Sequence, residues 1–86
     1  MPAVRRAEDE ADQVALGRAL RELGLRAELT QEDLAHRIGI DVTYVSQVER
    51  GRRGVRWATV LRFLRALDAS LMDLARELEQ DERASG

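Results

Sequence analysis

The chain has 86 residues, of which 44% are hydrophobic and only 3% aromatic, and it contains no cysteine. This length fits one folded domain, and the lack of cysteine excludes disulfide bonds, thiolate metal ligands and thiol catalysis. No apolar run reaches the ~20 residues of a membrane span, and residues 1–12 lack the apolar core of a signal peptide. We therefore expect a cytoplasmic protein that does not contact membranes, with an all-α core of leucine, valine, isoleucine and alanine.

The spacing of apolar and capping residues predicts five helices, the first of them over residues 11–27. Its expected buried face consists of Leu16, Leu20, Leu23 and Ala27. The second helix starts at Thr30, which pairs with Asp33 in a capping-box pattern, and it stops at Gly39. It is expected to bury Leu34, Ala35 and Ile38.

Asp41 is the predicted N-cap of a third helix, which ends at Gly51 and turns Val45 and Val48 inward. The fourth helix spans residues 56–67, and its apolar stripe, which we assign to the core, consists of Trp57, Val60, Leu61, Leu64 and Leu67. Ser70 caps the fifth helix, whose expected buried residues are Leu71, Leu74, Ala75 and Leu78. Residues 11–80 thus form the expected domain, flanked by flexible tails over residues 1–10 and 81–86.

Positive charge is concentrated after the third helix, although the net charge is −2 and nucleic-acid-binding domains are usually basic. Between Glu49 and Asp68 there is no acidic residue, and the arginines there are Arg50, Arg52, Arg53, Arg56, Arg62 and Arg65. Acidic residues gather instead over residues 8–12 and 77–82. One continuous stretch therefore carries the positive field. The alternative for the whole run is a solvated face, and the phosphate role is expected most of Arg50, Arg52 and Arg53 rather than of Arg62 and Arg65.

Residues 30–51 contain two short predicted helices joined only by Gly39, Ile40 and Asp41. So short a link makes the helices cross steeply, as they do in a helix-turn-helix unit. In that unit the second helix enters the major groove of DNA and meets base edges. Its outward positions here are Val42, Thr43, Ser46, Gln47 and Arg50, which include hydrogen-bonding side chains and a methyl surface for thymine. Arg50, Arg52 and Arg53 follow where the chain meets phosphate.

The same residues are similar to the Cro/C1-type, or xenobiotic-response-element, family of bacterial helix-turn-helix regulators. The shared motifs are Leu16-Gly17, Leu20-Arg21, Thr-Gln-Glu-Asp-Leu-Ala over 30–35, Gly39-Ile40 and Ser-Gln-Val-Glu-Arg-Gly over 46–51. The resemblance reaches about Leu74 and implies a five-helix, lambda-repressor-like fold with its helix-turn-helix at the second and third helices. It also implies a transcriptional regulator that binds a short palindromic operator in double-stranded DNA as a homodimer.

The resemblance assigns roles to individual residues as well. It implies a phosphate or base contact at Gln31, base contacts at Val42, Thr43 and Gln47, and backbone contacts at Tyr44, Arg50 and Arg53. Residues 41–46 resemble the controller proteins of restriction–modification systems, although Val42 stands where those often carry arginine. Gly24 stands where the family usually has an arginine that pairs with a buried glutamate. We expect Arg21 to pair with that glutamate, Glu49, in its place.

One helix-turn-helix module reads too few base pairs to select a single operator in a genome, so dimerisation is expected. The predicted contact surface is on the fifth helix and consists of Leu71, Met72, Ala75 and Leu78. The alternative is that these residues only cover the monomer core.

Enzymatic activity is not expected, because the sequence shows no nucleophile–base pair, metal-ligand cluster or phosphate-binding glycine loop. His36 is the single histidine, and a surface position fits it better than a metal site. No cofactor is expected. The alternative function is a protein-interaction module, such as an antitoxin or adaptor, whose acidic C-terminal tail binds a partner.

Overall fold

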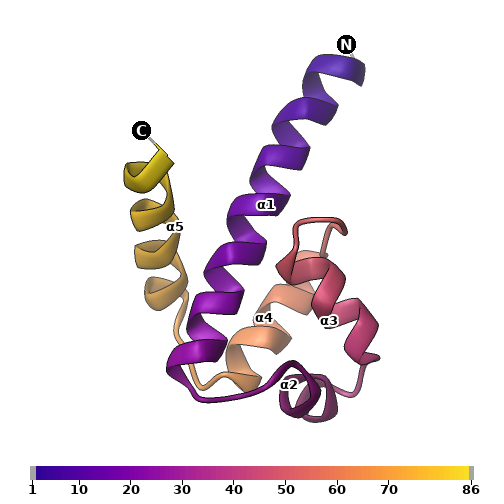
Figure 1. Ribbon diagram of the computed structural model, residues 1–86, viewed down its shortest axis with the longest axis vertical. Coiled ribbons are helices and arrows are strands. Elements are labelled where there is room, and N and C mark those ends of the chain that lie inside the picture. Colours follow the sequence, from indigo (N-terminus) through magenta and orange to yellow (C-terminus); the bar gives the residue numbers. More distant parts are fainter. Residues whose placement is uncertain (1, 86) are drawn as a thin grey trace.

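The computed structural model describes residues 2–85, with the side chains of residues 9–84. Its elements are all helices within those residues: α1 (Pro2–Arg26), α2 (Gln31–Ile38), α3 (Val42–Glu49), α4 (Trp57–Ala66) and α5 (Leu71–Ser85). The long helix α1 runs past the others, with α5 along one side of it and α3 on the other (Figure 1). Helix α2 packs against α3 and α4. The prediction of an all-α fold of five helices is confirmed.

The core lies where the helices meet and includes Leu74 of α5. Its largest fully buried side chains come from the first four helices and are Leu20, Leu34, Val45, Val48 and Phe63. The predicted inward faces of α2 and α3 are confirmed, since Leu34, Ala35, Ile38, Val45 and Val48 are all buried. In α1 the predicted Leu20 and Leu23 are buried. Ala27 is exposed, because α1 ends one residue before it and the chain turns away.

The prediction for α4 is wrong at its first residue. Trp57 is 59% exposed, whereas Phe63, which the predicted stripe omits, has no exposed surface. Trp57 does lie on the same side of α4 as the buried Val60, and both line one groove. That groove lies at the edge of the monomer core, since the buried Val60 and Leu74 also line it. The periodicity of the stripe therefore identifies the inward side of the helix, but not which of its residues other helices cover.

Helix α5 buries fewer of its apolar residues than the sequence pattern predicts. Leu74 is buried and Leu78 half-buried, but Leu71 is 52% exposed and Ala75 is exposed as well. The face that α5 turns to α1 includes a charged residue, Glu77, which is 5% exposed. Its carboxylate lies 2.5 Å from Nη1 of Arg26, and Asp81 one turn later lies 3.4 Å from Nη1 of Arg18. Ion pairs therefore form part of the contact between α1 and α5, for which the sequence predicts apolar packing.

Helix α1 begins at Pro2, whereas the sequence pattern predicts a helix from residue 11. Residues 2–10 are mostly alanine, arginine and glutamate, which are strong helix formers, and they include no glycine. Proline is tolerated in a first turn because the N–H that it lacks has no partner there. The helix thus continues without the apolar stripe on which the prediction relied, and α5 likewise continues to Ser85. The domain boundaries at residues 11 and 80 stay a prediction.

Two capping boxes, both predicted in part, begin α2 and α5. The Thr30 hydroxyl accepts from the Asp33 N–H at 3.0 Å, and the Asp33 carboxylate accepts from the Thr30 N–H at 3.0 Å. Ser70 and Asp73 exchange the equivalent bonds at 3.0 and 2.8 Å. The backbone N–H of Thr30, followed by its hydroxyl, lowers the pKa of Asp33, and Ser70 lowers the pKa of Asp73 in the same way.

These boxes predict a loss of stability in acid. A carboxyl group whose pKa is lower in the folded than in the unfolded chain stabilises the fold at higher pH, and this contribution disappears as pH falls below about 4. Urea denaturation at several pH values should show the decrease between about pH 4 and pH 2. In the double variant Asp33→Asn, Asp73→Asn, whose neutral amides keep an acceptor oxygen, the decrease should be shallower. Equal pH slopes in the two proteins would contradict the assignment.

Candidate nucleic-acid interface

The turn between α2 and α3 is made in three residues, as the sequence predicts. Gly39 adopts the left-handed conformation with φ of 81°, and its N–H donates to Ala35 O, which ends α2. Asp41 then caps α3, because its carboxylate accepts from the Thr43 N–H at 2.7 Å. Helix α2 packs directly on α3. The pair has the connection and packing of a helix-turn-helix unit.

The outer face of α3 carries the residues predicted to read bases. Val42 and Thr43, at the N-terminal end, are exposed, and Ser46 and Gln47 one turn later are partly exposed. Val45 and Val48 hold the opposite face in the core. Helix α3 therefore presents hydrogen-bonding and methyl groups outward from a fixed position, which is the arrangement that a major-groove helix needs.

The chain leaves α3 by folding back over it. Gly51 has φ of 72°, its N–H donates to Val48 O at 3.0 Å, and the Arg52 N–H donates to Gln47 O at 2.9 Å. This pair of bonds closes the end of the helix in a Schellman motif, for which glycine is the usual residue. The exposed side chains of Arg50, Arg52 and Arg53 thus lie beside the predicted base-reading face.

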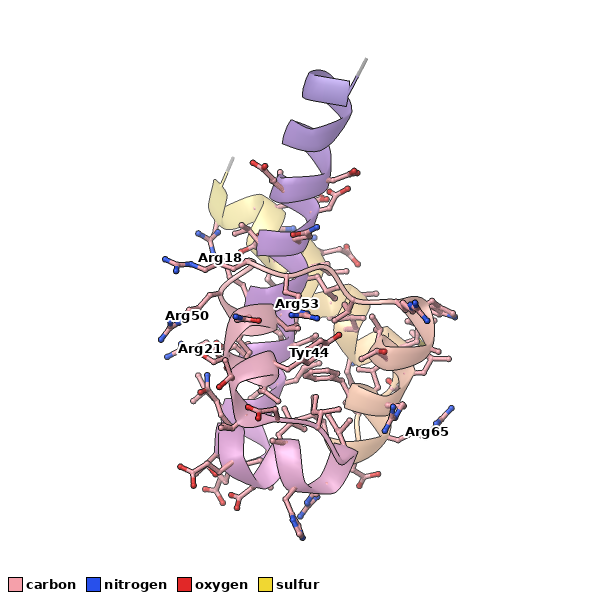
Figure 2. The ribbon with its side chains drawn as sticks, turned by 90° about the vertical axis from the view of Figure 1, so that its right-hand side faces the viewer. Arg18, Arg21, Tyr44, Arg50, Arg53 and Arg65 are labelled. Carbon is pink, nitrogen blue, oxygen red and sulfur yellow. The ribbon has the colours of Figure 1, made fainter. Side chains whose placement is uncertain are left out.

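Arg53 contacts that face directly. Its guanidinium carbon lies 4.8 Å from the centre of the Tyr44 ring, and its Nη1 donates to Gln47 Oε1 at 3.4 Å. In Figure 2, Arg53 and Tyr44 lie together beside α3. The sequence assigned Tyr44 and Arg53 to the DNA backbone and Gln47 to a base, but it gave no sign that the three touch. The Gly51 turn brings them together.

The predicted ion pair between Arg21 and Glu49 is wrong. Glu49 is 9% exposed, and its Oε1 accepts from Gln31 Nε2 at 2.8 Å. Arg21 lines the same pocket of about 170 Å³ as Gln31 and Glu49, but among the described residues it forms no ion pair with Glu49. Gln31 is the first residue of α2, and its side chain lies within hydrogen-bonding distance of Glu49, the last residue of α3. The neutral amide thereby joins the two helices of the unit.

The arginines of the basic stretch between residues 50 and 65 do not all lie on the same side of the molecule. Arg62 Nη2 donates to Ile38 O at 2.6 Å and so caps the end of α2, and Arg65 extends away from α3 on the far side (Figure 2). Arg21 of α1, in contrast, extends toward the same side as Arg50. That Arg21 adds a positive charge on this side of the molecule was not predicted from the sequence. The signal for it was a pair of arginines, Arg18 and Arg21, one turn apart on α1.

Within residues 2–85, each helix is too short or too polar to span a membrane, and no three side chains of histidine, cysteine, aspartate or glutamate are grouped as metal ligands.

Comparisons with known proteins agree with this geometry. Residues 15–78 match the family model described as a helix-turn-helix domain. The restriction-modification controller protein C.AhdI from Aeromonas hydrophila is 44% identical, and the alignment covers 74% of this chain and 97% of that one with a TM-score of 0.70. The clp gene regulator ClgR from C. glutamicum is 32% identical over 80% of this chain and 90% of that one, with a TM-score of 0.76.

A third structure is that of the controller protein C.Esp1396I, a tetramer in complex with its natural 35 base-pair operator. It is 25% identical, covers 79% of this chain and 90% of its own, and has a TM-score of 0.73. No curated protein matches the chain. The family match over most of the chain, the identity to C.AhdI and the cap-and-turn geometry of α2 and α3 lead to one conclusion: the chain belongs to the Cro/C1-type helix-turn-helix family of DNA-binding regulators.

Proposed function

We propose that this protein regulates transcription by binding a short palindromic operator as a homodimer, with α3 of each copy in the major groove. The observation that carries the proposal is the outer face of α3, where Thr43 and Gln47 face outward from a helix held in the core by Val45 and Val48. The complex of C.Esp1396I with its operator, a relative at 25% identity, supports it.

In this proposal two groups of residues divide the work. Base edges are read by Val42, Thr43, Ser46 and Gln47, whose methyl, hydroxyl and amide groups match the chemistry of the major groove. The DNA backbone is contacted by Tyr44, Arg50, Arg52 and Arg53, which set position, and the arginines supply affinity that depends on salt. Gln31 contacts a phosphate or a base.

The arrangement of charge favours the same orientation. Helix α5, which carries Glu77, Glu79, Asp81 and Glu82, lies on the side of α1 away from α3 (Figure 1). DNA repels that acidic side and attracts the arginines beside α3. The slightly negative net charge is therefore compatible with DNA binding, because the charges are separated in space.

The proposed dimer surface is built on the residues predicted from the sequence, namely Leu71, Met72, Ala75 and Leu78. The structure adds a neighbouring groove of about 660 Å³, lined by Asp12, Ala15, Leu16, Val55, Trp57, Val60, Leu74, Leu78 and Glu82. Trp57, in the lining of the groove, and Leu71 and Met72, at the start of α5, are exposed large apolar side chains. A two-fold contact requires one patch that is complementary to itself. In our proposal Trp57 of each copy supplies the apolar side chain and the groove of the other copy receives it.

Within the family we propose the role of a restriction–modification controller, because the identity to C.AhdI, 44%, exceeds the 32% to ClgR. Val42 replaces the arginine that controllers often carry, so the operator should differ at the base pair which that arginine reads. Genes for a methyltransferase and an endonuclease next to the gene for this protein would support the role.

Selection of DNA from a randomised pool, followed by gel shifts, tests the proposed function. The wild-type protein should enrich a palindrome. Gln47→Ala should weaken binding to it by roughly 1–3 kcal/mol and weaken binding to random DNA much less. Gln80→Ala makes the same change at an exposed position of α5 and is the matched control. It should leave the affinities for the palindrome and for random DNA unchanged. Absence of any enriched sequence would favour the alternative of a protein-interaction module.

A further inference from the structure

Gln47 is the one amide among the proposed base-reading residues, and its side chain already has a partner within the protein. Its Oε1 accepts from Arg53 Nη1 at 3.4 Å. A glutamine that reads adenine uses both ends of its amide, with the oxygen accepting from N6–H and the nitrogen donating to N7. The direction of the oxygen therefore decides which base edge Gln47 suits.

We infer that Arg53 is a positioning residue for specificity: it holds the Gln47 amide with its oxygen toward the loop and its NH₂ group toward the DNA. Gln47 then donates to acceptor-rich base edges, guanine N7 and O6 or thymine O4, and adenine is disfavoured at that position. This inference rests on the proposed function, since it concerns how the same helix reads DNA.

The chemistry of the pair permits only one orientation of the amide. A guanidinium group has donors and no acceptor, so it is the carbonyl oxygen of Gln47 that faces Arg53, and the nitrogen faces away. Gln47 is partly buried, which restricts the other rotamers of its side chain.

Two features of the fold keep Arg53 in place. Its guanidinium group lies over the Tyr44 ring at 4.8 Å, and Tyr44 packs against the core. The Gly51 turn, closed by the bond from Arg52 N–H to Gln47 O, returns the backbone over the same turn of α3. Backbone and side chain thus both direct Arg53 to Gln47.

The lysine variant separates this role from phosphate binding. Arg53→Lys keeps the positive charge, but an ammonium group lacks the planar fork that stacks on a ring while donating sideways. Arg52→Ala is the matched comparison, because Arg52 is exposed beside it and makes no side-chain hydrogen bond to Gln47 among the described contacts. Thermal unfolding of both variants should match that of wild type, since both side chains are exposed.

The experiment combines selection from a randomised DNA pool with affinity measurements at several salt concentrations. The base pair whose preference disappears in Gln47→Ala marks the position that Gln47 reads, and wild type should select guanine or thymine there. Arg53→Lys should lose at least about fivefold of the discrimination at that base pair and keep the salt slope. Arg52→Ala should keep the discrimination and reduce the slope by about 0.9.

Adenine as the wild-type choice at that position would overturn the inference, and so would unchanged discrimination in Arg53→Lys. Both results leave the proposed function intact, because the palindrome would still be selected. If wild type enriches no sequence at all, the proposed function fails and the inference fails with it.

Discussion

Replacing Gly17 with alanine should destabilise the protein by roughly 3 kcal/mol, at the upper end of what overpacking costs. A Cβ atom at Gly17 would lie 2.3 Å from Val48 O and 2.8 Å from Glu49 O. Both neighbours are backbone atoms at the end of α3, so no side chain can rotate away to make room. The two helices would have to separate, and the core between them would lose contacts.

Gly24→Ala in the same helix is the matched control for this prediction. Its Cβ would meet nothing closer than Leu29 O and Leu67 Cδ2, each at 3.9 Å. Alanine is favoured over glycine within a helix by roughly 0.5–1 kcal/mol, so this variant should be more stable than wild type. Urea denaturation of both variants measures the difference. If the two changes shift stability in the same direction, the close approach of α1 to α3 at Gly17 is not a determinant of the fold.

Trp57→Asp should abolish the proposed dimer and lower operator affinity by about 100-fold or more, because each half-site would then be bound without help from the other. Trp57 is 59% exposed, so the change should leave the monomer folded. A charge placed in an apolar contact has no partner there and costs more than the loss of packing alone. Sedimentation at micromolar concentration and gel shifts on the selected palindrome measure the two effects.

Two further variants define the surface involved. Met72→Asp, on the part of the surface predicted from the sequence, should dissociate the dimer as well. Leu25→Asp changes a leucine that is also 59% exposed but lies outside the groove, and it should sediment as wild type does. The proposed surface is wrong if the wild-type protein is a monomer under these conditions and Trp57→Asp binds the palindrome as tightly as wild type.

Features that depend on residues close in sequence could be predicted from the sequence. The caps at Thr30 and Ser70 each involve a partner three residues away, and the Gly39 turn depends on one residue's freedom to adopt positive φ. The inward faces of α2 and α3 follow from a 3.6-residue period in short helices with one buried side. Local chemistry therefore predicted the helix-turn-helix unit and the orientation of its second helix.

Features that depend on the path of the chain between helices could not be predicted in the same way. Glu49 meets Gln31 rather than Arg21 because of how the start of α2 lies against the end of α3. Arg53 reaches Gln47 because Gly51 reverses the chain. Trp57 belongs to the apolar stripe of α4, but it is 59% exposed because no other helix, among the residues that the structure describes, covers that end of the stripe. In each case the tertiary arrangement, which the sequence pattern does not contain, decides what the residue contacts.

The contact at Gly17 also has a consequence for the spacing of the operator. It joins α1 to α3 backbone to backbone, and α1 in turn packs along α5, so the proposed dimer surface and the reading helix belong to one stiff body. One base pair added between the half-sites increases their separation by about 3.4 Å and rotates one half-site relative to the other by about 34–36°. A contact between side chains could repack to follow that change. The contact of Gly17 with the carbonyl groups of Val48 and Glu49 involves backbone atoms only, so it has no side chain that could repack. We therefore expect the dimer to bind tightly at one spacing of the half-sites and to lose affinity when one base pair is added or removed.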